Sequence, residues 1–261
     1  MTKFTFDLSG RTAVVTGAGQ GVGRGIARTL AAHSAKVAVN DFMLDRARAV
    51  ADEIAAAGGK AIAVQADVGD FDGVQAMAVK IDQELGPVDI LVNNAGNAGP
   101  DGAMPRLDFW TTDPAEWDRY LHVNLFGVMT CARVFTGGMV ARGYGRIVTI
   151  VSDAGRAGEQ GHEAYSAAKA GAAGFSRALA RSLGRYGVTA NTISLSNMGR
   201  EGVEMTPEAQ ALVKEMLKRY VVRRQGRPDD VAAVVLLLAS EASSWITGQN
   251  YPVNGGYTFA I

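Results

Sequence analysis

The side chains best suited to carry chemistry are Tyr165 and Lys169, four residues apart in the segment Tyr165-Ser166-Ala167-Ala168-Lys169. The alanine-rich sequence predicts a helix, on which residues at this spacing share one face, about 5–6 Å apart at Cβ. An ammonium about 4 Å from the phenol oxygen, at an effective dielectric constant of about 20, contributes about 4 kcal/mol. That energy could lower the pKa of the phenol from about 10 toward about 7. We therefore expect Tyr165 to exchange a proton with a substrate.

Two further polar residues could assist this pair. Ser152 ends a β-branched run upstream of Tyr165, and its hydroxyl could hold a substrate oxygen beside the phenol. Asn124 lies in a predicted helix, where its amide could connect the helix backbone through water to Lys169. Taken singly, a Tyr-x-x-x-Lys pair is common by chance and a helical Asn is more often structural. The hypothesis therefore depends on all four side chains meeting.

A glycine-rich segment near the amino terminus is typical of a phosphate-binding turn. It runs Thr16-Gly17-Ala18-Gly19-Gln20-Gly21-Val22-Gly23 and joins the first predicted strand to the first predicted helix. Its glycines permit a tight turn and let backbone N–H groups approach a pyrophosphate at the helix N-terminus. The spacing is T-G-x-x-x-G-x-G rather than the strict G-x-G-x-x-G. A strand-to-helix turn without a ligand is the simpler alternative.

Acidic residues after the next two strands could bind other parts of a dinucleotide. Asp41 lies about twenty residues past the glycine segment, where its carboxylate could accept hydrogen bonds from the adenosine ribose and repel a 2′-phosphate. Gln20 is uncharged, so the glycine segment offers no basic partner for that phosphate. Asp67 and Val68 end the third strand and could bind the adenine edge. This pattern favours NAD over NADP, the alternative being that Asp41 is an ordinary solvated acid.

The elements that must position these residues alternate along the chain. Short β-branched runs predict strands over 12–16, 36–40, 61–65, 89–93, 146–151, 188–194 and 249–253, and apolar residues at helical spacing lie between them. This alternation favours a parallel sheet covered on both faces, with ligands at the carboxyl ends of the strands. No linker divides the chain. We therefore predict a single α/β domain over residues 1–261, doubly wound and Rossmann-type, with a parallel seven-stranded sheet.

Two long segments interrupt this alternation. Residues 97–114 carry three prolines and follow the fourth strand, and residues 195–226 follow the sixth. Both leave the sheet at the edge where ligands bind. Within the second segment one helical face is apolar, formed by Leu212, Val213, Met216, Leu217 and Tyr220. We expect the segment 195–226 to be a lid whose helix lies over a pocket.

Composition argues against several classes of protein. Lys and Arg together equal Asp and Glu at 26 each, without runs of like charge, so neither a nucleic acid nor a membrane surface is expected as a partner. Cys131 is the only cysteine, which suits a reducing compartment, and the three histidines lack metal-ligand spacing. The first ten residues do not resemble a secretory signal, and the purely apolar run 231–239 is too short to cross a bilayer. We expect a cytoplasmic protein without metal, with small molecules or copies of itself as partners.

Together these motifs resemble the short-chain dehydrogenase/reductase family, in its subgroup of about 250 residues. The resemblance rests on residues 16–23, Asp67, Asn93-Asn94-Ala95-Gly96, Asn124, Ser152 and the Tyr165–Lys169 pair, and it covers nearly the whole chain. It implies an NAD-dependent alcohol dehydrogenase or ketoreductase in which Asn124, Ser152, Tyr165 and Lys169 are catalytic. It also implies a homotetramer or homodimer that packs through the helices around Asn124 and Tyr165.

The resemblance further assigns cofactor contacts. Asn94, Ala95 and Gly96 are implied to line the cofactor cleft, and Lys169 to bind the nicotinamide ribose. The position of Met198 matches a residue whose backbone meets the nicotinamide carboxamide. The expected cofactor-binding set is Gly17, Gly19, Gln20, Gly21, Val22, Gly23, Asp41, Asp67, Val68, Asn94, Ala95, Gly96, Tyr165, Lys169 and Met198. One departure concerns the turn before Met198: many relatives have Asn-x-x-x-Pro-Gly, whereas this chain has Asn191-Thr192-Ile193-Ser194-Leu195-Ser196.

Two functions remain open on these grounds. The first is an oxidoreductase that transfers a hydride between NAD(H) and a medium-sized, mostly apolar secondary alcohol or ketone, such as a cyclic, steroid-like or acyl-thioester compound. The second is a catalytically weak nucleotide-binding regulator on the same fold. Ser152, Tyr165 and Lys169 favour the enzyme, whereas the missing Pro-Gly turn keeps the regulator open.

Three further features of the sequence give weaker signals. Asp153 could cap the turn after Ser152 or repel an anionic substrate, and His162 could touch substrate or lie at the surface. The arginines of the lid segment could bind an anionic group, but a salt-bridged lid is the preferred interpretation.

Overall fold

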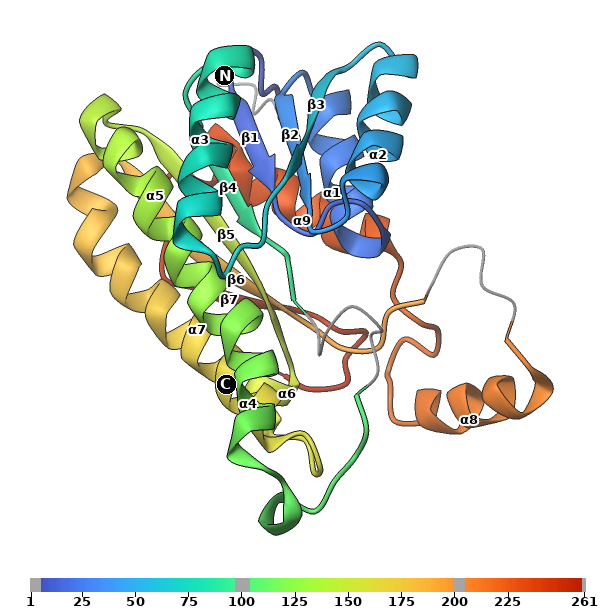
Figure 1. Ribbon diagram of the computed structural model, residues 1–261. Coiled ribbons are helices and arrows are strands. Elements are labelled where there is room, and N and C mark those ends of the chain that lie inside the picture. Colours follow the sequence, from blue (N-terminus) through green and yellow to red (C-terminus); the bar gives the residue numbers. More distant parts are fainter. Residues whose placement is uncertain (1–5, 97–103, 200–204, 260–261) are drawn as a thin grey trace.

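The computed structural model describes residues 6–96, 104–199 and 205–259. Seven strands form one sheet in the order β3-β2-β1-β4-β5-β6-β7, and all neighbouring pairs are parallel (Figure 1). The strands are β1 (Thr12–Val15), β2 (Lys36–Asp41), β3 (Lys60–Gln65), β4 (Ile90–Asn93), β5 (Gly145–Ser152), β6 (Val188–Leu195) and β7 (Asn250–Val253). All seven predicted strands are present, and each end lies within one residue of its prediction.

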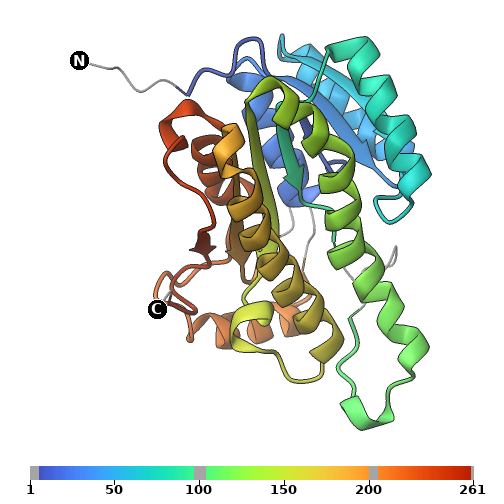
Figure 2. The ribbon, with the colours of Figure 1, turned by 90° about the vertical axis from the view of Figure 1, so that its left-hand side faces the viewer.

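Helices cover both faces of this sheet, which explains why the central strands are buried throughout. One face carries α1 (Gly21–Ala32), α2 (Leu44–Ala56) and α9 (Pro228–Ala239), and the other carries α3 (Phe71–Leu85), α5 (Gly127–Arg142) and α7 (Glu163–Leu183) (Figures 1 and 2). Each face has its own apolar cluster, with Ile26 and Leu30 in the first and Met77, Ile81 and Met139 in the second. The doubly wound, Rossmann-type fold expected from the strand–helix alternation is therefore confirmed.

One helical stretch is long and apolar enough, by length and composition, to cross a membrane. It runs from Pro114 to Arg142 and joins α4 (Pro114–Leu121), a π-helical segment (His122–Phe126) and α5. Its α5 part packs against α3, α7 and the strands β4 and β5, as a core helix does. The prediction from the sequence rests only on purely apolar runs, and this stretch is not one because it contains polar residues such as Arg119 and Asn124.

The segment between β6 and α9 is closed at its base. Met198 forms a parallel bridge with Gly226, and the Gly199 N–H donates to the Gly226 carbonyl at 2.9 Å. Beyond this base lies α8 (Pro207–Leu217), in which no residue is buried. Figure 1 shows α8 apart from the sheet and its covering helices.

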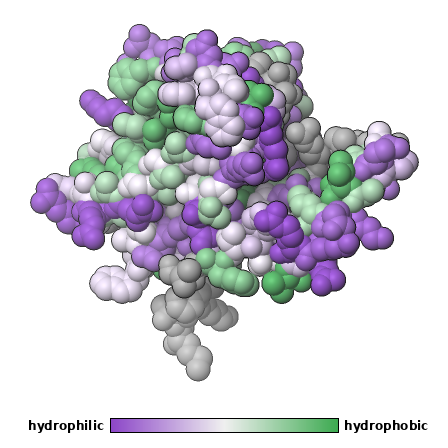
Figure 3. All heavy atoms as spheres, turned by 90° about the horizontal axis from the view of Figure 1, so that it is seen from below, coloured by the Kyte–Doolittle hydropathy of each residue, from purple (hydrophilic) through white to green (hydrophobic). Residues whose placement is uncertain are grey.

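The helix expected inside the lid is present, but its apolar face does not lie where we predicted. α8 ends at Leu217, so Tyr220 lies beyond the helix, in a turn whose N–H groups bond to carbonyls three residues earlier. Leu212 is 73% exposed. Seen from below, the projecting lid at the right carries hydrophobic as well as hydrophilic atoms on its surface (Figure 3). The helical spacing of the apolar residues predicted the helix correctly. What that helix packs against depends on residues far away in the sequence.

Candidate active site

A cavity of about 760 Å³ opens at the carboxyl ends of the strands. Nearly all the predicted site residues line it, although they come from segments far apart in the sequence. The lining residues among them are Gly17, Gln20, Gly21, Val22, Gly23, Asp41, Asp67, Val68, Asn94, Ala95, Gly96, Ser152, Tyr165, Lys169 and Met198. Gly19 and Asn124 do not line the cavity, but each approaches a lining residue: the Gly19 N–H donates to Asp41, and Asn124 Oδ1 lies next to Gly96. Its volume is within the usual range of about 300–1,000 Å³ for ligand sites.

The glycine segment forms a tight turn between β1 and α1, in which only glycine fits at two positions. Gly17 has φ 59°, and a Cβ there would lie 2.8 Å from Ala95 Cα. A Cβ on Gly23 would overlap the Gly17 carbonyl oxygen and the Asn94 amide. The helix begins after Gln20, whose side chain makes no capping hydrogen bond. The first N–H groups of α1 therefore face the cavity without a side-chain cap, which fits an anionic ligand.

Asn94 fixes this turn to the end of β4. Its side-chain amide donates to the carbonyls of Thr16 at 2.9 Å and Gly17 at 3.0 Å. In return, Thr16 Oγ1 accepts hydrogen bonds from the N–H groups of Asn94 and Ala95, both at 3.0 Å. The ends of β1 and β4 are thereby held together at the cavity floor.

The structure excludes the alternative interpretation of Asp41 as an ordinary solvated acid. It is 6% exposed at the end of β2, where Oδ2 accepts from the Gly19 N–H and Oδ1 from the Met43 N–H, each at 3.0 Å. Its carboxylate thus borders the glycine turn. Arg46 lines the same part of the cavity, and a Cβ on Gly19 would lie 2.5 Å from Arg46 Cβ.

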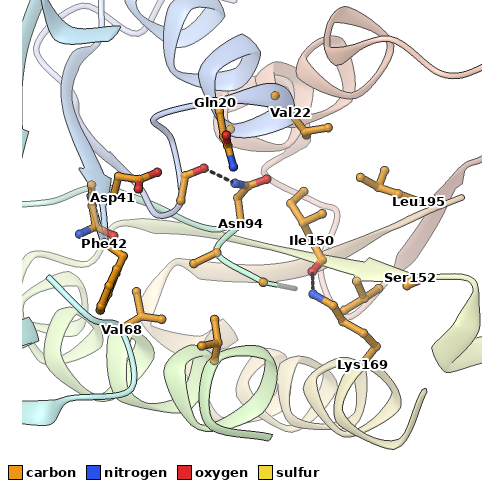
Figure 4. Close-up of a pocket in the computed structure, with 18 of the residues that line it drawn as sticks. Gln20, Val22, Asp41, Phe42, Val68, Asn94, Ile150, Ser152, Lys169 and Leu195 are labelled. Atoms are coloured by element: carbon orange, nitrogen blue, oxygen red, sulfur yellow. Dashed lines mark hydrogen bonds between the residues drawn. The ribbon is translucent and has the colours of Figure 1, made fainter. Parts of the chain in front are cut away.

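Asp67 lies at the same end of the cavity as Asp41. Its Oδ1 accepts from the Gly69 N–H at 2.9 Å, and its Oδ2 is 3.4 Å from His122 Nε2. Beside Asp41, the ring of Phe42 is directed into the cavity toward Val68 (Figure 4). This arrangement provides an aromatic face and a carboxylate at one end of an elongated site.

The lining residues at this end that sequence reasoning missed include Phe42, Arg46, Arg119 and His122. Phe42 directly follows Asp41, so an aromatic residue at the end of a ligand-binding strand was an available signal. Arg46, Arg119 and His122 project from helices, and no spacing in the sequence marks them.

The opposite end of the cavity holds Ser152, Tyr165 and Lys169. Lys169 is 5% exposed, and its Nζ donates to the Ile150 carbonyl at 3.1 Å (Figure 4). Burial lowers the pKa of Lys169 to about 8. The Nζ atom is 5.8 Å from the centroid of the Tyr165 ring, so the two side chains share one helix face as predicted.

The predicted fall in the pKa of Tyr165 is corrected by the structure. Burial raises the pKa of Tyr165, and a hydrogen bond with Ser152 acts in the opposite direction. The Coulomb argument assumed an ammonium beside the phenol oxygen in a solvated setting. In the structure, Lys169 is directed at a backbone carbonyl, and desolvation of the phenol is the dominant effect.

Asn124 is fully buried in the π-helical segment, and its Nδ2 donates to the Tyr120 carbonyl at 2.9 Å. Its Oδ1 and Lys169 Nζ both lie within 2.8 Å of the point that a Cβ on Gly96 would occupy. The two side chains therefore converge next to Gly96, on the wall of the cavity. A π-helical turn of this kind is frequent at functional sites because it redirects one side chain.

Leu195 and Ser196 stand where many relatives have the Pro-Gly pair. Both line the cavity wall, as does Met198. The Met198 side chain packs closely on the lid base, since a Cβ on Gly226 would lie 2.6 Å from Met198 Sδ. None of the apolar residues of α8 lines the cavity.

The weaker candidates have structural contacts. Asp153 makes no capping bond; it is 3% exposed, pairs with Arg156 at 3.1 Å and accepts from Asn254 Nδ2 at 2.7 Å. His162 lines a separate small cavity, and its Nε2 lies 3.1 Å from the Met104 carbonyl oxygen.

Of the lid arginines, Arg219, Arg223 and Arg224 do not line the main cavity either, and Arg200 lies outside the described residues. Arg224 pairs with Asp230, and the Arg219 guanidinium lies over the Tyr257 ring. Within residues 6–96, 104–199 and 205–259, no group of three His, Cys, Asp or Glu side chains could hold a metal ion.

Comparison with known proteins gives matches over nearly the whole chain. The family described as enoyl-(acyl carrier protein) reductase matches residues 17–258. The 3-oxoacyl-[acyl-carrier-protein] reductase FabG of Staphylococcus aureus is 38% identical over 94% of this chain and 97% of its own. The (2S)-[(R)-hydroxy(phenyl)methyl]succinyl-CoA dehydrogenase subunit BbsD of Thauera aromatica is 37% identical over 95% and 97%.

A solved structure agrees with these sequence matches. The gluconate 5-dehydrogenase of Burkholderia cenocepacia, in complex with NADP and tartrate, superposes with a TM-score of 0.88 at 30% identity and 98% coverage of both chains. The fold, the order of the motifs and these relatives agree: this chain belongs to the short-chain dehydrogenase/reductase family of oxidoreductases.

Proposed function

We propose that the protein catalyses reversible hydride transfer between NAD(H) and a secondary alcohol or ketone, with Tyr165 as the proton donor or acceptor. One observation carries this proposal: Ser152, Tyr165 and Lys169 line one end of the cavity whose other end is lined by the glycine turn, Asp41 and Asp67. A nucleotide-binding regulator would need only the second group. The enzyme is therefore favoured over the regulator.

The residues present suit a dinucleotide along this cavity. The glycine turn and the N-terminus of α1 would hold the pyrophosphate, Asp41 the adenosine ribose, and Asp67 with Val68 the adenine edge. Asn94, Ala95 and Gly96 would line the middle of the cleft, and Lys169 and Met198 the nicotinamide end. When bound, the nicotinamide ring supplies or accepts the hydride.

The chain's own residues handle the proton. Ser152 and the Tyr165 hydroxyl would bind the substrate oxygen together, since they already share a hydrogen bond. Because burial raises the pKa of Tyr165, the phenol is protonated at neutral pH and can donate to the oxygen of a ketone. In the reverse direction the phenol must first give up its own proton, after which the same oxygen accepts the proton of the alcohol. Lys169 Nζ would pass the proton to or from Tyr165, and Asn124 would hold a water through which Lys169 exchanges that proton with solvent.

The substrate we propose is of medium size and mostly apolar, either cyclic, steroid-like or an acyl thioester. The wall beside Ser152 supports this class, because Ile150, Val151, Leu195 and Met198 are apolar. The names of the two relatives, an acyl-carrier-protein reductase and a coenzyme A-ester dehydrogenase, agree with the thioester option.

A homodimer or homotetramer in the cytoplasm completes the proposal. Phe126 and Met129 are 48% and 41% exposed on the helical stretch that includes α5, which supports packing of that surface against another copy. The single cysteine, Cys131, is buried and unpaired, which suits a reducing compartment.

Tyr165→Phe tests the enzyme hypothesis. We expect the variant to lose about 10²–10⁴-fold in kcat, the usual contribution of a positioned acid or base. Its affinity for NADH should stay within about twofold, because the phenol oxygen is replaced by hydrogen without loss of the ring. Turnover across a panel of cyclic ketones and acyl thioesters gives kcat, and NADH fluorescence gives affinity.

The matched control is Tyr251→Phe, which removes a hydroxyl in β7, away from the cavity lining. It should retain the activity of the unmodified protein. If Tyr165→Phe kept most of its turnover, the proposed proton transfer would be wrong. NADH binding by the unmodified protein without turnover of any alcohol or ketone would instead support the regulator.

Asp41→Ala tests the choice of cofactor. The carboxylate lies where a 2′-phosphate would sit, so we expect the unmodified protein to bind NADH more tightly than NADPH and the variant to lose most of that preference. Arg46, on the same rim, would then attract the phosphate. Titrations of both cofactors with both proteins measure the ratio. A preference of the unmodified protein for NADPH would overturn the assignment of NAD, and the gluconate 5-dehydrogenase structure, solved in complex with NADP, makes this outcome worth testing.

A further inference from the structure

The turn between β6 and the lid lacks the Pro-Gly pair expected by resemblance, and its two residues both line the cavity. A proline restricts its own φ, whereas Ser196, which follows the last residue of β6, carries no such restriction. Beyond the turn, the Met198–Gly226 bridge and the bonds of Gly226 N–H and Gln225 to Asn197 hold the base of the lid. None of these bonds restrains Ser196 itself.

The hydroxyl of Tyr220 supplies that restraint. It forms a hydrogen bond with Ser196 Oγ and accepts a second one from the Asn197 N–H at 3.2 Å. Tyr220 is 5% exposed and is the one buried residue within 205–227. Two consecutive residues of the turn are thus bonded to one oxygen atom on the returning arm of the lid.

Tyr220 is itself anchored to the carboxyl-terminal loop. Its ring stacks on Tyr257, with centroids 4.9 Å apart and planes 28° apart. The Val222 N–H donates to the Gly255 carbonyl at 2.8 Å, and Asn254 in the same loop donates to the buried carboxylate of Asp153 at 2.7 Å. Asp153 directly follows Ser152. These contacts therefore connect Tyr220, through the carboxyl-terminal loop, to the neighbour of Ser152.

We propose that the Ser196–Tyr220 hydroxyl pair is a positioning device that replaces the restraint of a Pro-Gly turn and holds the backbone at Met198 in the geometry needed for the nicotinamide end of the cofactor. This inference rests on the proposed function. The pair acts through the turn and does not touch the reacting atoms, so both are positioning residues. Loss of the pair should therefore weaken binding of the nicotinamide half of the dinucleotide only. The glycine turn, Asp41 and Asp67 are held by other hydrogen bonds, which do not involve Ser196 or Tyr220.

The test compares NADH with ADP-ribose, which contains the adenosine, pyrophosphate and second ribose but no nicotinamide. We expect Tyr220→Phe and Ser196→Ala each to weaken NADH binding about tenfold, the effect of about one lost hydrogen bond. ADP-ribose affinity should change less than about twofold in both. The KM for NADH should rise more than kcat falls. The double variant should bind NADH no more weakly than Tyr220→Phe alone, because Tyr220→Phe already removes the bond to Ser196.

Tyr257→Phe is the matched control: it removes a hydroxyl from the same stacked pair, and no side-chain hydrogen bond of that hydroxyl is present among the described residues. It should bind both ligands as the unmodified protein does. Ser196→Thr keeps the hydroxyl and should restore tight NADH binding. If Tyr220→Phe does not fold, Ser196→Ala carries the test alone, with thermal unfolding to show that it is native.

Three outcomes overturn the inference. Unchanged NADH affinity in both variants shows that the hydroxyl pair positions nothing. An equal loss of NADH and ADP-ribose affinity shows a general structural role. If the unmodified protein binds neither NADH nor NADPH, the proposed function fails, and the inference fails with it; the first two results leave the proposed function standing.

Discussion

At the scale of single residues, the buried ammonium of Lys169 lowers the stability of the folded protein. Its ammonium is 5% exposed, and burial lowers its pKa from 10.5 to about 8. A difference of this size corresponds to about 3 kcal/mol of folding free energy. Because the unfolded chain holds this proton more tightly, stability rises with pH between the two pKa values. The cost is therefore complete below about pH 8 and disappears as the pH approaches 10.5.

We expect Lys169→Met to stabilise the protein at pH 7 while it abolishes turnover. Methionine fills a similar volume without charge, and about 1 kcal/mol corresponds to a change of about 2–4 °C in Tm for a chain of this size. Thermal unfolding at pH 7 and near pH 10 measures the difference in Tm, which should shrink at the higher pH.

Lys214→Met, on the exposed α8, is the matched control and should show no such pH dependence. A Lys169→Met variant whose Tm is unchanged or lower at pH 7 would contradict the cost that we assign to the buried ammonium.

At the scale of elements, the distance between α6 (Ala154–Ala157) and α7 decides how Ser152 meets Tyr165 and Lys169. α6 follows Ser152 almost directly, and Gly155 lets it pack on the backbone of α7. A Cβ on Gly155 would lie 2.7 Å from Ala170 N and 2.8 Å from Lys169 C. Neither atom can move without moving the helix. The glycine thus sets the spacing between the serine-bearing and lysine-bearing elements.

Gly155→Ala should therefore separate the two elements. We expect a destabilisation of about 1–3 kcal/mol, as for overpacking elsewhere. A fall in kcat of about tenfold or more should accompany it, since small misplacements of reacting groups are costly. ADP-ribose affinity should not change. Steady-state kinetics and denaturant unfolding check these outcomes.

Gly174→Ala, on the same helix, is the matched control. The nearest atom to its added Cβ would be Arg177 Nη2 at 3.7 Å, so alanine fits there. Replacing glycine within a helix should stabilise the protein by about 0.5–1 kcal/mol without changing kcat. Native kcat and native stability in Gly155→Ala would refute the role of the α6–α7 contact.

At the scale of the whole molecule, the strand order explains why one cavity has two chemically different ends. The chain builds β1, β2 and β3 outward in one direction and then β4, β5, β6 and β7 in the other. On the first side Asp41 ends β2 and Asp67 follows β3, and Ser152 ends β5 on the second. The glycine turn and Asn94 lie between them, at the point where the order reverses, which is where open α/β sheets bind ligands.

The same topology accounts for the apolar stretch Pro114–Arg142. Its length and composition would suit a membrane, yet its α5 part covers the sheet beside α3 and α7. Its exposed part includes Phe126 and Met129. In our proposal a second copy of the chain covers these residues, so the stretch is divided between an internal core and an external interface.

The sequence by itself determined the strands and the identities of many of the residues around the cavity. Strand limits follow from local β-branched runs, the glycine turn from the spacing of glycines between a strand and a helix, and the shared edge from the parallel alternation of strands and helices. These signals are local or depend only on chain order, so they survive without knowledge of tertiary contacts.

The tertiary structure alone decided the environment of those residues. Burial and the direction of the Lys169 side chain reversed the expected pKa shift of Tyr165, and backbone N–H groups from two segments hold Asp41. The lid helix turned away from the cavity, and Tyr220 bonded to Ser196 across 24 positions of the chain. Desolvation and hydrogen bonds between distant segments exist only once the chain has folded, so no spacing in the sequence records them.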